Sequence, residues 1–191
     1  MAEVNKRMKT RTKAPKNNEK VSLVSLGGVG EIGKNMFAFE YEGEIVVIDG
    51  GLKFPEDDML GVDIVIPDIT YLVENQDKVA AILLTHGHED HIGGLPYILK
   101  QLSIPVYGTK LTLGILEGKL KEKGMLADCD LRQIRPGMKL QVTKNIQAEF
   151  FVVNHSIPDA VGICLRTPAG LIVHCGDFKI DRSEEHTSEL Q

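Results

Sequence analysis

The chain has 191 residues and a net charge of −5, with 42% of its residues hydrophobic and 26% charged. This composition is typical of one globular domain and excludes wholesale disorder. No apolar run reaches the roughly 18–20 residues that span a bilayer, and the N-terminus lacks an apolar signal core, so we expect a cytoplasmic protein without a membrane segment.

The first twenty residues form a basic arm. Residues 1–20 contain seven lysines and arginines but only two acidic residues, Glu3 and Glu19. We expect a disordered arm that either contacts phosphates or acts only as a solvated tail. The three cysteines form no CxxC pair, which predicts reduced thiols rather than disulfides.

After the arm, strands come first, and strands mixed with helices follow. Strands are predicted where apolar and polar residues alternate, or where a short apolar run is bounded by turn residues. They cover residues 21–26, 36–41, 45–48, 79–84, 148–153, 162–166 and 171–174, with a hairpin turn at Glu42-Gly43 and with 79–84 buried on both faces. Helices are predicted over residues 68–75, 94–102 and 109–123. This order predicts an α/β fold in which sheets pack against helices.

The strongest chemical signal is the segment THGHEDHIGG at residues 85–94, directly after a predicted apolar strand. In an extended turn, residues two apart project the same way, so His86 and His88 can hold one metal together. Asp90 and His91 lie one turn further on and can present an oxygen and a nitrogen to a second metal. These ligand types suit Zn²⁺ best, and Mn²⁺ or Mg²⁺ where oxygen ligands are plentiful. The cluster therefore predicts a site for two divalent cations.

Two later residues lie just beyond predicted strands, where a metal site needs further ligands. His155 could supply a third nitrogen to the first metal, and the carboxylate of Asp177 could bridge the two metals. Taken alone, a histidine or aspartate in such a position is more often a surface or capping group. Both gain weight from the four ligand-type residues of the earlier segment.

The HxHxDH motif, the later histidine and the later Gly-Asp pair resemble the motifs of the metallo-β-lactamase superfamily. The resemblance implies a four-layer αβ/βα sandwich over residues 21–181, incomplete at its C-terminal end, with the site at an edge between two sheets. The implied ligands are His86, His88 and His155 for the first metal, Asp90 and His91 for the second, and Asp177 between them. The family adds one more histidine to the second metal from a later motif, and we find no equivalent of it here.

Four further segments resemble the ribonuclease J family, in which this domain is combined with a β-CASP domain. They are GGVGEIGKN at 27–35, FPEDDMLGVD at 54–63, HSIPD at 155–159 and GDFK at 176–179. The resemblance implies RNA as substrate, endonucleolytic and 5′-to-3′ exonucleolytic cleavage, and a role in RNA maturation and decay. It also implies a homo-oligomer with RNA-decay protein partners for the full-length protein. Because the RNA channel of that family depends on parts beyond this chain, we expect the chain alone to be inactive.

The glycine-rich segment at residues 27–33 could be mistaken for a dinucleotide-binding loop. Its spacing is not GxGxxG before a helix, and it leads into another predicted strand. We expect its backbone instead to approach a phosphate or the metal ligands closely.

Two residues are expected to support the site from behind. Asp49 ends a predicted strand and is suited to hydrogen-bond a ligand histidine, with a simple turn cap as the alternative. His174 is expected to hold the site's structure rather than bind metal. Cys175 stands where the family has threonine, and we expect it to pack or support rather than act as a ligand; Gly50 is a second departure from the family pattern.

The expected reaction is hydrolysis of a phosphodiester, with Asp90 and Asp177 as the catalytic residues. Two metals would lower the pKa of a water and stabilise the charge that builds on the phosphate, and Asp90 could orient the nucleophile. Two alternatives remain: a thioesterase or lactonase with the same metals, and a non-enzymatic RNA-binding or assembly module. The segments at 27–35 and 54–63 argue against the first, and the intact HxHxDH ligands argue against the second.

The last ten residues, RSEEHTSELQ at 182–191, do not fit the preceding pattern. They resemble the translation of a sequencing-library adaptor, and we interpret them as an artefact, with a genuine polar C-terminus as the alternative. His186 is therefore left out of the mechanism.

Overall fold

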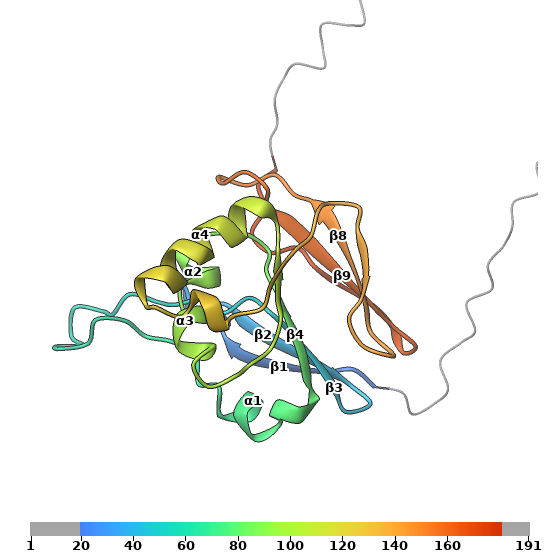
Figure 1. The fold of residues 1–191 in the computed structure, drawn as a ribbon, viewed down its shortest axis with the longest axis horizontal. Helices are drawn as coiled ribbons and strands as arrows, with labels where there is room; N and C mark the ends of the chain where they lie inside the picture. The colour runs from blue at the N-terminus through green and yellow to red at the C-terminus, as the bar shows by residue number, and fades with distance from the viewer. Residues whose placement is uncertain (1–19, 181–191) are drawn as a thin grey trace, which may run out of the picture.

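Two β-sheets form the centre of the structure and pack face to face (Figure 1). This computed structural model describes residues 20–180, so the predicted basic arm, apart from Lys20, and the predicted artefact tail lie outside the described residues. The strands are β1 (Ser22–Gly27), β2 (Met36–Tyr41), β3 (Glu44–Ile48), β4 (Val79–Leu83), β5 (Val106–Gly108), β6 (Leu131–Gln133), β7 (Lys139–Gln141), β8 (Gln147–Val152), β9 (Val161–Thr167) and β10 (Gly170–His174).

The helices are short except for one. They are α1 (Thr70–Glu74), α2 (Glu89–Ile92), α3 (Leu95–Ile98) and α4 (Lys110–Glu122), with 3₁₀ turns η1 (Gln76–Lys78) and η2 (Leu126–Asp128). Among the residues that the structure describes, no helix is both long and apolar enough to cross a membrane.

The larger sheet changes from antiparallel to parallel along its width. Its order is β1-β2-β3-β4-β5-β6, with β1, β2 and β3 antiparallel and β3 to β6 parallel. The predicted hairpin between β2 and β3 is confirmed, and Glu42 and Gly43 form its two-residue turn with φ of 50° and 77°. Positive φ at both positions is the geometry of the tight turn that matches the twist of the strands. The smaller sheet, β10-β9-β8-β7, is antiparallel throughout.

The two faces of the larger sheet bury two different cores. Alternate residues of β2, such as Phe39 and Tyr41, pack against Phe150 and Ile163 of the smaller sheet. The other set, such as Ala38, packs beneath α3 and α4. Because both faces are covered, β4 is apolar along its whole length, as predicted.

The predicted α/β class is confirmed, and three layers of the sandwich lie within residues 20–180: helices, larger sheet and smaller sheet. The outer face of the smaller sheet presents exposed apolar side chains, among them Leu171 and Val173. In this part of the chain no helix covers that face.

Several elements were not predicted. Strands β5, β6 and β7 have three residues each, too few for an alternating pattern to emerge. The helix predicted over residues 94–102 is regular only over Leu95–Ile98, and α2 precedes it inside the HxHxDH segment. Gly93 and Gly94 separate the two, and a side chain on Gly94 would collide with the carbonyl oxygen of Gly51.

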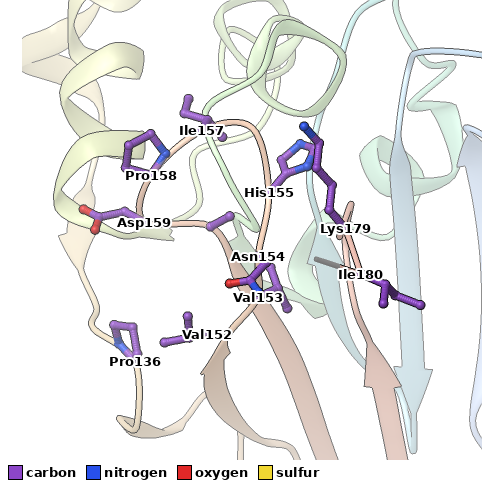
Figure 2. Close-up of a pocket in the computed structure, with 11 residues that line it drawn as sticks. Pro136, Val152, Val153, Asn154, His155, Ile157, Pro158, Asp159, Lys179 and Ile180 are labelled. Atoms are coloured by element: carbon purple, nitrogen blue, oxygen red, sulfur yellow. The ribbon is translucent and has the colours of Figure 1, made fainter. Parts of the chain in front are cut away.

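A cavity of about 680 Å³ lies at the end of the smaller sheet (Figure 2). It is bounded by the segment from Val152 to Ala160 and by Lys179 and Ile180. His155 forms part of its wall, so the cavity adjoins the residues that the sequence singles out.

Candidate metal centre

Four strand ends meet at one edge of the sandwich and carry the candidate site. Strands β3 and β4 are parallel, so Asp49 and the segment from Thr85 onward leave the larger sheet at the same edge. Strands β8 and β10 both run antiparallel to β9, so the segments that lead to His155 and Asp177 leave the smaller sheet together. A backbone hydrogen bond of 2.9 Å from Val161 N to Thr85 O joins the two sheets at this edge.

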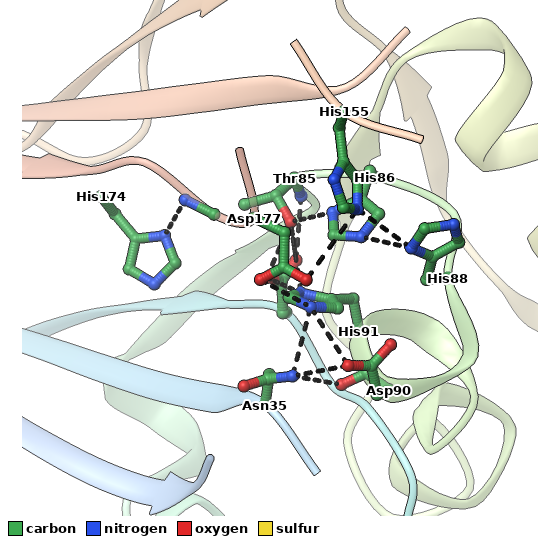
Figure 3. Close-up of polar contacts among 11 residues, drawn as sticks. Asn35, Thr85, His86, His88, Asp90, His91, His155, His174 and Asp177 are labelled. Carbon is green, nitrogen blue, oxygen red and sulfur yellow. Dashed lines mark hydrogen bonds and ion pairs between the residues drawn. The ribbon is translucent and has the colours of Figure 1, made fainter. Parts of the chain in front are cut away.

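Three histidines form the first group of candidate ligands (Figure 3). His86 Nε2 lies 3.0 Å from His88 Nδ1, and His155 Nε2 lies 3.1 Å from that same atom. Ligand nitrogens around a tetrahedral Zn²⁺, each about 2.0–2.1 Å from the metal, would lie roughly 3.3 Å apart. The three nitrogens therefore fit a single divalent cation of this size.

A second group forms around His91 Nε2. Asp90 Oδ2 and Asp177 Oδ1 each lie 3.6 Å from that nitrogen. The other oxygen of Asp177, Oδ2, lies 3.9 Å from His155 Nε2. Asp177 therefore points one oxygen at each group, which is the arrangement required of a bridging carboxylate. The donor set as a whole fits two divalent cations.

Asp49 is completely buried behind His91. Its Oδ2 lies 2.8 Å from His91 Nδ1, and its Oδ1 accepts the backbone N–H of Thr85 at 2.8 Å. Burial alone would raise the pKa of Asp49, but the charge and hydrogen bond of His91 bring it below the ordinary value. Burial alone would lower the pKa of His91, but the charge of Asp49 raises it. With Nδ1–H donated to Asp49, His91 turns the lone pair of Nε2 toward the site.

Thr85 connects Asp49 to His86 and orients that ring in the same way. Its hydroxyl donates to Asp49 Oδ2 at 2.9 Å, and its oxygen lies 3.0 Å from His86 Nδ1. With the hydroxyl proton directed at Asp49, the oxygen accepts Nδ1–H of His86 and leaves Nε2 free to bind a cation. Burial, followed by the charge of His91, lowers the pKa of His86 to about 3, so this ring is neutral at pH 7. Sequence reasoning gave Thr85 no role, although its place between a buried strand and the first histidine was a usable signal.

Asn35 is the second residue that sequence reasoning missed. Its Nδ2 donates to Asp90 Oδ2 and to the Asp90 carbonyl oxygen, both at 3.1 Å, and lies 3.2 Å from His91 Nε2. In the sequence Asn35 ends the GGVGEIGKN segment, and nothing in the local pattern indicates its contact with Asp90. The amide holds the Asp90 carboxylate beside His91.

His155 and His174 have different surroundings. His155 is partly buried, which lowers its pKa, and its buried Nδ1 has no hydrogen-bond partner among residues 20–180. His174 accepts the N–H of Gly176 at 3.2 Å, and its ring packs against Phe37 with centroids 5.2 Å apart. This hydrogen bond holds the turn that leads to Asp177. Cys175 is half-buried and free.

Comparison with known sequences places these residues in a family context. The model of the metallo-beta-lactamase superfamily matches residues 29–189. Ribonuclease J2 of Bacillus subtilis is 52% identical over 169 residues, which cover 88% of this chain and 30% of that protein. Ribonuclease J 1 of Streptococcus pyogenes is 50% identical over 166 residues, which cover 87% of this chain and 29% of that protein. Ribonuclease J of Thermus thermophilus is 50% identical over 167 residues, covering 84% and 29%. The chain thus spans about 30% of the length of these relatives.

Solved structures share the fold at low sequence identity. Zn²⁺-bound PqqB from Methylobacterium extorquens superimposes with a TM-score of 0.57 at 14% identity, over 78% of this chain and 54% of that one. A diphosphatase of the PhnP family gives a TM-score of 0.52 at 20% identity, over 76% of this chain and 62% of that one. At these identities the similarity concerns the fold alone.

Proposed function

Since the chain belongs to the metallo-β-lactamase superfamily, we propose that it is the metal-binding part of a ribonuclease that hydrolyses RNA phosphodiester bonds. The observation that carries the proposal is the position of Asp177, whose two oxygens face His91 and His155 from between the two ligand groups. The identity of 50–52% to three ribonucleases J supports RNA as the substrate.

The proposed metal ligands follow from the two groups. His86, His88 and His155 would hold the first cation, Asp90 and His91 the second, and Asp177 both. The nitrogen-rich first group favours Zn²⁺, while the carboxylates of the second group would also suit Mn²⁺ or Mg²⁺. When bound, such cations supply ionised water near neutral pH and Lewis-acid stabilisation of phosphate charge.

The side chains themselves would position the reacting groups. Asp90 is held by Asn35 with one carboxylate oxygen directed at the site, so it can accept a hydrogen bond from an attacking water and orient it. Asp177 lies at the mouth of the site, with its side chain 48% exposed, where it can reach both water and substrate. Asp49 and Thr85 keep His91 and His86 in the tautomers that ligand binding requires.

The finer features of the function are extensions of the same proposal. We assign the enzyme both endonucleolytic and 5′-to-3′ exonucleolytic cleavage, in cytoplasmic RNA maturation and decay, as a homo-oligomer with protein partners. Because the chain spans about 30% of its relatives, we also propose that turnover of RNA needs the parts it does not contain.

The metal content of the purified chain tests the centre without relying on activity. After loading with Zn²⁺ and desalting, elemental analysis should find two ions per chain, and His88→Ala should reduce the number to one. Asp77→Asn is the control and should retain both, because Asp77 is an exposed residue of η1 and belongs to neither ligand group. No bound metal, or an unchanged content in His88→Ala, would contradict the assignment.

The substrate class is tested on the longer gene product. The proposal expects cleavage of single-stranded RNA and no hydrolysis of a thioester or lactone. Efficient thioester hydrolysis without RNA cleavage would make the protein a small-molecule hydrolase instead.

A further inference from the structure

A cavity of about 410 Å³ lies directly beside the candidate metal centre, against Asp90. Ile32, Leu52 and Phe54 form its apolar walls, and Lys53 adds a cation. Ile32 is 89% exposed and Phe54 is 65% exposed. Single exposed apolar residues are ordinary on a protein surface. Two of them that line one cavity beside a proposed catalytic carboxylate indicate a binding site.

The walls of this cavity are fixed relative to the metal ligands. Lys34 N donates to Leu52 O at 3.0 Å, Asn35 N to Asp90 O at 2.9 Å, and Leu52 N to Glu89 O at 3.1 Å. The three loops that carry Ile32, Phe54 and Asp90 are thus tied together through their backbones. A ligand that enters the cavity would meet a preformed surface at a set distance from the centre.

The charges around the cavity are mixed: two lysines lie on its loops, and the carboxylates of Glu89 and Asp90 form part of its wall. Lys53 forms an ion pair with Glu56 at 2.6 Å and lies 3.9 Å from Glu31, while Lys34 pairs with Glu31 at 3.1 Å. The two lysines lie on the loops that form the walls. Glu56 is exposed, and a pair such as Lys53–Glu56 contributes little to stability, so a phosphate can replace Glu56 at small cost.

We propose that this cavity binds one unpaired nucleobase of the RNA substrate, stacked on Phe54 and in contact with Ile32, next to the phosphate at the metal centre. The inference rests on the function proposed above and adds to it a residue pair that selects single strands. An aromatic ring accepts the face of any base, so such a subsite tolerates sequence, whereas a base inside a duplex has both faces covered by its neighbours.

The test uses the Zn²⁺-loaded protein and a non-cleavable probe. The probe is a six-nucleotide single-stranded RNA with 2′-O-methyl sugars and one 2-aminopurine, whose fluorescence falls when the base stacks. Phe54→Ala should weaken binding on the order of tenfold and abolish the quenching, because one stacked base contributes about that much. Phe54→Tyr should bind nearly as the wild type, since it retains the ring, and Ile32→Ala should lose a smaller share.

Leu60→Ala is the matched control. Leu60 is 91% exposed on the same loop as Phe54 but does not line the cavity, so this variant should bind the probe normally. Unchanged binding by Phe54→Ala, absence of quenching in the wild type, or an equal loss in Leu60→Ala would each overturn the subsite. An equal loss would identify the apolar residues as a surface for another protein segment.

Inorganic phosphate separates this inference from the function on which it rests. Its affinity for the metal-loaded protein, measured by calorimetry, should be the same in the wild type and in Phe54→Ala. If the wild type binds neither metal nor phosphate, the metal centre itself is wrong. If the wild type binds metal and phosphate, but the Phe54→Ala variant binds the RNA probe as tightly as the wild type does, only the base subsite is wrong.

Discussion

Replacing Asp49 with asparagine is the most informative single change behind the metal centre. Asp49 is completely buried and has φ of 61°, a conformation that asparagine adopts more readily than most residues. The substitution keeps the shape and the backbone, and it removes only the negative charge and one acceptor. The new side chain would still accept the N–H of Thr85, but its amide group would face both Nδ1 of His91 and the hydroxyl of Thr85.

The expected magnitude has two parts. Loss of a hydrogen bond between charged, buried groups costs about 1.5–3 kcal/mol, so the metal-free protein should lose that much stability. For a chain of this size, such a loss lowers Tm by roughly 3–12 °C. His91 would then carry its proton on Nε2 and turn an N–H toward the cation, and loss of such a supporting carboxylate typically weakens metal binding about 10- to 100-fold.

The two parts are measured separately. Thermal unfolding in the presence of a chelator reports the stability of the metal-free fold, and a chelator-competition titration with Zn²⁺ reports each binding step. The binding step of the second ligand group should change most, because His91 belongs to that group. Asp77→Asn, an exposed carboxylate in η1, serves as the control and should alter neither quantity.

The reasoning would be refuted by Zn²⁺ affinities within about twofold of the wild type together with an unchanged Tm. That result would mean that Asp49 only caps the turn after β3, the alternative that the sequence left open. A loss of stability with unchanged metal affinity would mean that the buried pair of Asp49 and His91 stabilises the fold but does not affect metal binding by His91.

Three further changes test other parts of the site. Asp177→Asn should weaken both metal-binding steps, because its oxygens face both ligand groups, and a titration that shows only one step affected would argue against bridging. The pKa of His86 is lowered from 6.5 to about 3. As the pH falls below 6.5, this histidine therefore takes up a proton in the unfolded chain before it does so in the folded one. The free energy of unfolding of the metal-free protein should fall by up to about 2 kcal/mol by pH 5. Chemical denaturation should find this pH dependence reduced in His86→Gln. Gly51→Ala would place a methyl group on the carbonyl oxygen of Asp90, so denaturation should show a loss of about 2 kcal/mol or more, whereas Gly118→Ala, with open space at its Cβ, should not.

Most of the regular structure follows from local pattern. Alternation and short apolar runs predicted seven of the strands to within a residue or two, and the apolar run at residues 79–84 indicated a strand covered on both faces. These patterns are readable because each strand contributes enough residues to display its period. Strands β5 to β7 are too short for that, and only pairing with their neighbours makes them strands.

The candidate ligands were also identified from the sequence, because HxHxDH puts four ligand-type residues within six positions. The fold class and the superfamily are confirmed. The roles of the individual ligands remain predictions that the geometry supports. The chain of contacts behind them was not readable: Asp49 and His91 are separated by 42 residues, and Asn35 and Asp90 by 55.

By itself, the sequence determined the identity of the ligand-type residues, the strands that carry them and the family. The tertiary structure alone decided that Thr85 connects His86 to Asp49, that Asn35 holds Asp90, and that Phe54 and Ile32 line a cavity beside the centre. The physical reason is that spacing along the chain sets the direction of neighbouring side chains. Distances between separate strand ends depend on sheet order and on how the two sheets pack.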